Sequence, residues 1–122
     1  MVNKINSLFA NSKDQKLLSL YFCAGAPTLD STANTILAMQ KAGVWVELTN
    51  LIIPDVNDDK EMIREMCRWI AGNGLADNPL HFSRFFPRYK MADVLPTPIH
   101  TLKEAKQIAQ EEGIKHVYLG NV

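Results

Sequence analysis

Apart from residues 44–58, the cluster most suggestive of ligand binding combines basic and aromatic side chains: Arg84, Arg88, Tyr89 and Lys90 accompany Phe85 and Phe86. Arginine can hold a carboxylate through two parallel hydrogen bonds, and an aromatic ring can stack on an adenine or a cation. The commoner arrangement is that Phe85 and Phe86 are core residues and the basic side chains are solvated. The group alone identifies no reaction.

Glu47 and Thr49 occupy alternate positions in an apolar segment, residues 44–53. In an extended strand such positions share one face. Two interpretations are equally supported. The pair lines a polar barrel or cleft interior, or it covers the solvent-facing side of an exposed sheet.

Potential metal ligands are present, but their spacing matches no known site. His81, His100 and His116 form no His-x-x-x-His unit, and Cys23 and Cys67 form no Cys-x-x-Cys unit. The acidic residues after position 54 lack the pattern of a calcium loop, and helix capping explains them better. Phosphate-binding glycine motifs and a nucleophile elbow are also absent from the sequence. We assign no metal ligand and no catalytic residue, and we expect both cysteines to be reduced, buried thiols.

The segments that must position these side chains alternate between helix and strand patterns. We predict strands at residues 44–53, 80–86 and 114–119, and helices that start near Thr28, Asp58 and Pro98 and stop at Gly43, at Gly72-Asn73-Gly74 and at Gly113. This alternation predicts an α/β fold of three consecutive βα-type units with a parallel sheet, a fragment of a TIM-like (β/α) barrel.

Helix starts can be assigned from capping residues. Asn57 or Asp58 is predicted to cap the second helix, whose core-facing stripe starts at Met62. Thr97 is predicted to cap the third, with Pro98 at the first helical position.

In α/β folds, functional groups gather at the carboxyl ends of the strands. This rule predicts one rim formed by Asn50 and by residues 54–58, 83–89 and 120–122. Such a rim suits a polar ligand. Three parallel strands also leave two open edges, so we interpret the chain as a section of something larger.

The 122 residues suffice for one domain. Thirteen basic and thirteen acidic side chains cancel, so bulk charge gives no reason to expect nucleic acid or an anionic membrane as a partner. No run approaches the roughly 18 apolar residues of a membrane span, and no signal peptide is recognisable. We expect a cytoplasmic location.

Four phrases resemble one family in order and spacing. They are KAGVWVELTNLIIPDVND at residues 41–58, HFSRFFPRYKM at 81–91, PTP at 96–98 and HVYLGNV at 116–122. The family is the radical S-adenosylmethionine enzymes related to pyruvate formate-lyase activating enzyme, in particular the AmmeMemoRadiSam system radical SAM enzymes. The resemblance implies a barrel that holds S-adenosylmethionine and a [4Fe-4S] cluster. It implies cofactor contacts by Thr49, Ser83, Arg84 and Phe86.

The family's cluster-binding Cys-x-x-x-Cys-x-x-Cys loop has no counterpart in this sequence, and two cysteines cannot supply three thiolates. The resemblance therefore implies the carboxyl-terminal part of such a barrel, inactive alone and unable to bind the cofactors by itself. Residues 1–20 are interpreted as a non-homologous leader and residues 21–122 as the barrel portion. The expected partner is the missing half of the barrel or a second copy. The alternative is a non-catalytic module that binds a partner or oligomerises through its open sheet edges.

Overall fold

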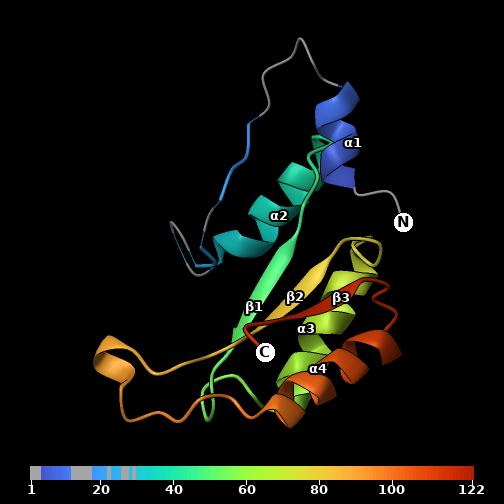
Figure 1. The fold of residues 1–122 in the computed structure, drawn as a ribbon. Coiled ribbons are helices and arrows are strands. Elements are labelled where there is room, and N and C mark those ends of the chain that lie inside the picture. The colour runs from blue at the N-terminus through green and yellow to red at the C-terminus, as the bar shows by residue number, and fades with distance from the viewer. Residues whose placement is uncertain (1–3, 12–17, 22, 26–27, 29) are drawn as a thin grey trace. The chain divides into compact units, whose positions relative to one another are not determined.

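A computed structural model describes residues 4–11, 18–21, 23–25, 28 and 30–122 of the chain (Figure 1). Its contacts divide the chain into residues 1–33 and residues 34–122, and the sheet lies within the second group. The elements are α1 (Lys4–Asn11), α2 (Ser31–Lys41), β1 (Leu48–Ile52), α3 (Lys60–Gly72), β2 (Leu80–Arg84), the 3-10 helix η1 (Tyr89–Met91), α4 (Ile99–Glu111) and β3 (Val117–Gly120). Helix α1 lies in the segment that the sequence analysis interprets as a non-homologous leader.

The three strands form a parallel sheet in the order β1-β2-β3. Figure 1 shows α3 and α4 on the same side of this sheet. Strands that are neighbours in both sequence and space, with their connecting helices on one side, are wound as in a (βα) barrel and not as in a doubly wound sheet. The predicted α/β fold of consecutive βα units is confirmed, and the arrangement is consistent with a section of such a barrel.

All three strands have limits that differ from the predicted ones. Strand β1 starts at Leu48 instead of Val44, because its partner β2 starts at Leu80, which is paired with Leu48. Strand β2 ends at Arg84, where it is paired with the last residue of β1. Ile114 does not begin β3, because its N–H donates to the carbonyl of Ala109 and completes the end of α4. Strand limits therefore follow the available ladder partners.

The helix stops were predicted well and the helix starts were not. Helices α2, α3 and α4 are each followed by a left-handed glycine and a hydrogen bond that reaches back five residues; the glycines are Gly43, Gly74 and Gly113. Helix α2 starts at Ser31, so Thr28 is not its cap. Asp59 caps α3, since its carboxylate accepts hydrogen bonds from Glu61 N and Met62 N, both at 3.0 Å.

Asn57 and Asp58, the predicted caps of α3, stabilise the preceding turn instead. The Asn57 side chain accepts from Ile53 N and donates to Leu51 O, and the Asp58 carboxylate accepts from Asp55 N. Met62, predicted to be a core residue, is 52% exposed. The buried stripe of α3 is formed by Ile63, Cys67 and Ile70.

Thr97 is not the cap of α4, because the helix starts at Ile99 and Thr97 is fully buried before it. Its hydroxyl donates to Ile52 O at 2.5 Å and accepts from Phe85 N at 3.2 Å. Its own N–H donates to Phe85 O at 3.1 Å. One side chain thus connects the carboxyl end of β1 with the residue that follows β2.

The core lies between the sheet and the helices. Its fully buried centre consists of Ile52, Cys67, Leu75, Leu80, Phe82, Leu102 and Ile114. Because strand side chains alternate between faces, the residues of this core leave the other face of the sheet without a helical cover among the described elements. That uncovered face is where functional groups can be sought.

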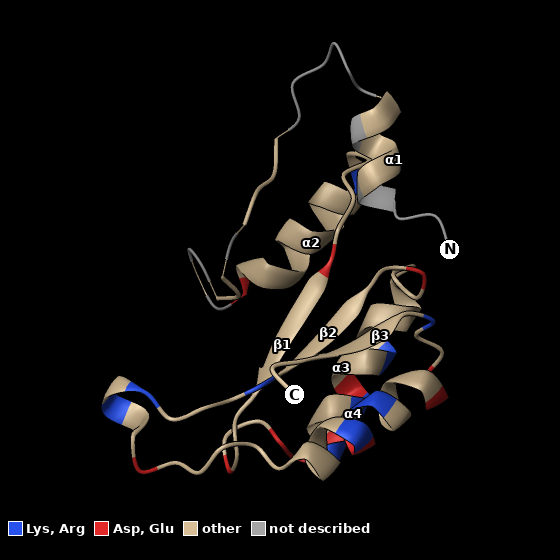
Figure 2. Cartoon of the chain, viewed as in Figure 1, with Lys and Arg blue, Asp and Glu red and all other residues tan. Residues whose placement is uncertain are grey.

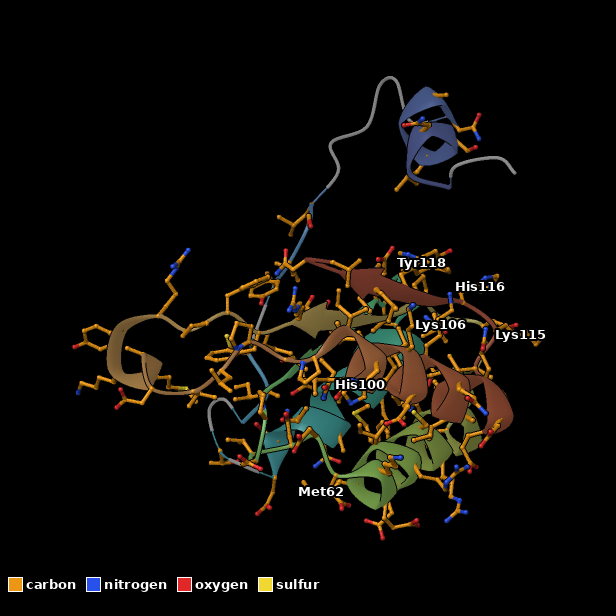
Figure 3. All side chains as sticks on the ribbon, turned by 60° about the horizontal axis from the view of Figure 1, so that its bottom comes forward. Met62, His100, Lys106, Lys115, His116 and Tyr118 are labelled. Carbon is orange, nitrogen blue, oxygen red and sulfur yellow. The ribbon has the colours of Figure 1, made fainter. Side chains whose placement is uncertain are left out.

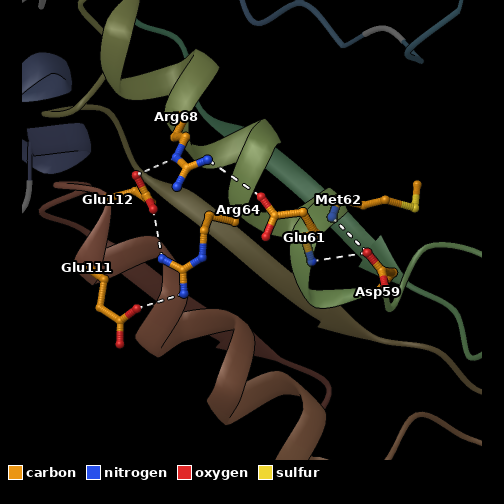
Figure 4. Close-up of polar contacts among 7 residues, drawn as sticks. All are labelled: Asp59, Glu61, Met62, Arg64, Arg68, Glu111 and Glu112. Carbon is orange, nitrogen blue, oxygen red and sulfur yellow. Dashed lines mark hydrogen bonds and ion pairs between the residues drawn. The ribbon is translucent and has the colours of Figure 1, made fainter.

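Charged side chains gather on α3, on α4 and in the loop after β2, while the strands carry few of them (Figure 2). Arg64 on α3 contacts Glu112 at 2.7 Å and Glu111 at 2.9 Å, and Arg68 contacts Glu112 at 3.3 Å (Figure 4). These ion pairs join α3 to α4, in addition to the apolar contacts between the two helices. None of the described helices is both long enough and apolar enough to cross a membrane.

Candidate functional site

Two rows of side chains cross the uncovered face of the sheet. Strand register aligns Thr49 with His81 and His81 with Tyr118 in the first row. It aligns Leu51 with Ser83 and Ser83 with Gly120 in the second. A Cβ atom at Gly120 would lie 3.1 Å from Ser83 Oγ, so the glycine leaves space for that hydroxyl.

Glu47 lies just before β1, on the same side of the chain as Thr49, and contacts the first row diagonally. Its Oε2 is 2.8 Å from His81 Nε2, and its Oε1 accepts a hydrogen bond of 3.0 Å from the indole N–H of Trp45. The Glu47 and His81 side chains are 38% and 34% exposed. The pair is therefore held by protein groups and is still open to a ligand.

The surroundings of Glu47 favour its ionised form. The hydrogen bond from Trp45 is the main cause that lowers the pKa of Glu47 below its ordinary value of 4.5. Partial burial opposes this effect, while the hydrogen bond and the charge of His81 lower the pKa further. The carboxylate is thus a stable acceptor for a proton-carrying nitrogen of His81.

Glu47 contacts the edge of the His81 imidazole, and Tyr118 contacts its face. Its ring stacks on His81 with centroids 5.3 Å apart and planes inclined by 26°. Figure 3 shows Tyr118 on the side of β3 that points away from α4. A carboxylate and a stacked ring together restrict the orientation of His81, and an imidazole held in this way can accept a proton from a bound molecule and return it.

The carboxyl rim of the sheet carries unusual backbone conformations. The described residues other than glycine with positive φ are Asp55 (60°), Tyr89 (51°) and Asn121 (59°), and they follow β1, β2 and β3 respectively. Asn and Asp tolerate the left-handed region, but a tyrosine there is uncommon and costs energy. Asn121 Nδ2 also donates to Arg84 O at 3.4 Å, which links two strand ends.

The structure separates the four residues predicted to bind a cofactor. Thr49 and Ser83 lie on the uncovered face, in adjacent rows. Arg84 follows the alternation to the other face, where its Nε donates to Thr97 O at 2.6 Å and its guanidinium lies 4.8 Å from the Phe86 ring centre. Phe86 lies beyond the strand and is exposed. A ligand-binding role for any of the four stays a prediction.

Of the two phenylalanines that the commoner arrangement places in the core, only one is buried. Phe85 is a core residue, whereas Phe86 is exposed. Lys90 lies 5.5 Å from the ring centre of Tyr89, which is 86% exposed. Asn50, predicted to lie on the rim, faces α3 instead, with its amide nitrogen 3.4 Å from Met66 Sδ.

The sequence pattern placed Glu47 and Thr49 opposite the apolar face, but it did not predict the contacts of Glu47 with Trp45 and His81 or the stacking of His81 on Tyr118. The available signal was strand alternation, which puts Glu47, Thr49, His81 and Ser83 on one face once the strands are parallel.

Within the described part of the chain, no three His, Cys, Asp or Glu side chains are grouped closely enough to hold a metal ion. His100 and His116 lie at opposite ends of the α4 segment, away from each other (Figure 3). Burial raises the pKa of the Cys67 thiol to about 11, so it is predominantly protonated at neutral pH. Cys23, expected to be buried, is exposed.

No family model matches the chain. An uncharacterized protein of Methanocaldococcus jannaschii is 46% identical over 95 residues, which are 78% of this chain and 28% of that protein. The tryptophan synthase alpha chain of Bacteroides thetaiotaomicron is 39% identical over 75 residues, or 62% of this chain and 29% of the relative. The tryptophan synthase alpha chain of Phocaeicola vulgatus is 36% identical over 74 residues, which are 61% of this chain and 28% of that protein. The chain spans less than a third of the length of these relatives.

These relatives overturn the resemblance to radical SAM enzymes. The named ones are tryptophan synthase alpha chains, and no radical SAM family is indicated. The radical SAM function, the S-adenosylmethionine and the [4Fe-4S] cluster expected from that resemblance are therefore wrong. The alternative, a non-catalytic module that acts through open sheet edges, is not supported either. The chain shares with the tryptophan synthase alpha chains a segment of about 75 residues with similar sequence.

Proposed function

We propose that residues 34–122 form a wall section of a (βα)-barrel enzyme in which Glu47 and His81 are the acid–base pair. The contact of 2.8 Å between their side chains, on the uncovered face of the sheet, carries this proposal. In a closed barrel that face lines the interior. A carboxylate beside an imidazole is suited to moving one proton from a substrate and back.

The name of the relatives indicates the class of reaction. Those proteins are called tryptophan synthase alpha chain, so we propose that the activity belongs to the synthesis of tryptophan. The word chain also denotes one component of an enzyme with others, which supports a protein partner. Since the relatives are more than three times longer than the matched segment, we further propose that the outer edges of β1 and β3, which pair with no other strand among the described residues, pair with additional strands of the same barrel.

A chimera tests the function in a complete protein. Residues 34–122 of this chain, which contain both Glu47 and His81, replace the corresponding stretch of the Bacteroides thetaiotaomicron tryptophan synthase alpha chain, and the product is expressed in a bacterium that lacks its own alpha chain. We expect growth without tryptophan. Glu47→Gln is expected to lower the activity of the purified chimera by about 10²–10⁴-fold, the usual range for loss of acid–base catalysis.

Glu65→Gln is the matched control, because Glu65 is an exposed residue of α3 on the far side of the sheet from the pair. It is expected to grow like the parent chimera. A chimera that does not fold would contradict a shared barrel wall, and a folded chimera without growth would contradict the function. Growth of the Glu47→Gln variant at the parent rate would exclude the proposed pair.

A further inference from the structure

We infer that His81 exchanges the proton with the substrate through Nδ1, and that Glu47 and Trp45 are positioning residues that hold its proton-carrying Nε2 in place. This inference rests on the proposed function and assigns separate roles to the members of the acid–base pair.

The carboxylate of Glu47 has both oxygens engaged by protein groups. Oε1 accepts from Trp45 Nε1 at 3.0 Å, and Oε2 is 2.8 Å from His81 Nε2. An indole nitrogen can only donate, so Oε1 must be an acceptor. A carboxylate whose two oxygens already contact donors on the protein is poorly placed to take a proton from a substrate.

The ionised Glu47 determines where the imidazole carries its proton. A carboxylate is an acceptor only, so a hydrogen bond with His81 requires the proton on Nε2. In the neutral imidazole the lone pair is then on Nδ1. The atom that can act as a base is therefore the one that points away from Glu47.

The His81 side chain is one-third exposed. Among the described residues, its polar and ring contacts are Glu47 at Nε2 and the stacked ring of Tyr118, and neither of them is a hydrogen bond to Nδ1. Stacking on Tyr118 fixes the plane in which Nδ1 must meet a donor. The fitting substrate group is an O–H or N–H that reaches His81 in this plane.

The proton moves between the substrate and His81 only, and no other reactant takes part. The substrate O–H or N–H bond breaks, its electron pair stays on the oxygen or nitrogen, and the proton forms a bond with Nδ1. The positive charge of the resulting imidazolium is paired with the carboxylate of Glu47. Return of the proton to the product restores the neutral ring.

The position of the proton on His81 can be measured in the full chain by NMR with ¹⁵N-labelled histidine. We expect neutral His81 to be protonated at Nε2, with Nδ1 bare. Glu47→Gln is expected to remove this preference, because an amide can donate as well as accept. Trp45→Phe is expected to raise the pKa of Glu47, followed through its side-chain carboxyl carbon. Trp69→Phe is the matched control and is expected to change neither signal.

Two results would overturn the inference. One is a neutral His81 protonated at Nδ1 in the parent chain, and the other is an unchanged preference in Glu47→Gln. Kinetics of the chimera provide an independent readout: His81→Gln keeps a donor for Glu47 but cannot accept a proton, and kcat should fall by about 10²–10⁴-fold. Trp45→Phe should lower kcat less, with KM unchanged. The NMR result concerns this chain alone, so it can fail or hold whatever the growth test of the function gives.

Discussion

Thr97 connects three segments through one buried hydroxyl. The hydroxyl lies between Ile52 O and Phe85 N, and both partners are backbone groups at the ends of neighbouring strands. A buried backbone group without a partner is costly, so the position of the loop before α4 depends on this side chain. The same contact keeps the carboxyl rim of β1 and β2 in one geometry.

Replacing Thr97 by valine tests this role, because the shape is kept and the hydroxyl is lost. We expect the free energy of unfolding to fall by about 1–3 kcal/mol, since Ile52 O and Phe85 N lose their partner. Thr97→Ser keeps the hydroxyl and loses one methyl group, which should cost about 1 kcal/mol. Urea denaturation measures both variants. Equal stability of the parent chain and the Thr97→Val variant would show that the buried hydroxyl contributes nothing.

At the level of elements, α3 and α4 are joined by apolar contacts and by the charge network of Arg64 (Figure 4). Hydrogen bonds from Arg64 are the main cause that lowers the pKa of both Glu111 and Glu112. These carboxylates end a helix, where negative charge is unfavourable, so the arginine compensates an otherwise poor helix end.

Arg64→Ala should destabilise the chain at pH 7 and much less at pH 3. Carboxyl groups with a lowered folded pKa stabilise the fold above their unfolded pKa, near 4.5, and this contribution is lost as the pH falls through the folded pKa. High salt should also reduce the difference between the parent and the variant. Urea denaturation at both pH values measures the difference in the free energy of unfolding between the parent chain and Arg64→Ala. Lys103→Ala, which removes an exposed cation from α4, is the control; a difference for Arg64→Ala that is the same at both pH values would contradict the mechanism.

At the level of the whole molecule, the buried apolar side chains of the described residues extend from Ile36 to Val117. All of them lie within residues 34–122. The core that determines stability is therefore formed by α2, the sheet, α3 and α4. The boundary of the barrel portion at residue 21 stays a prediction.

A chain of residues 21–122 tests this boundary. We expect it to unfold cooperatively with the thermal midpoint of the full chain, because no described core residue is removed. A chain of residues 43–122 lacks Ile36 and the hydrogen bond of 2.9 Å from Gln40 to Gly74 O, so its midpoint should be lower. Circular dichroism follows both transitions. A clear loss of stability in the 21–122 chain would assign a structural role to the first twenty residues.

The sequence alone determined the order of the elements, the parallel sheet and the helix stops, because apolar periodicity and left-handed glycines are local properties. It also produced a wrong family. An apolar strand, a turn and a capped helix are requirements of any βα unit, so phrases such as residues 41–58 carry little information about the reaction. Only tertiary structure brought Glu47 to His81 and His81 to Tyr118. These contacts join residues on different strands, and the pairing register that creates them depends on backbone hydrogen bonds between segments far apart in the chain.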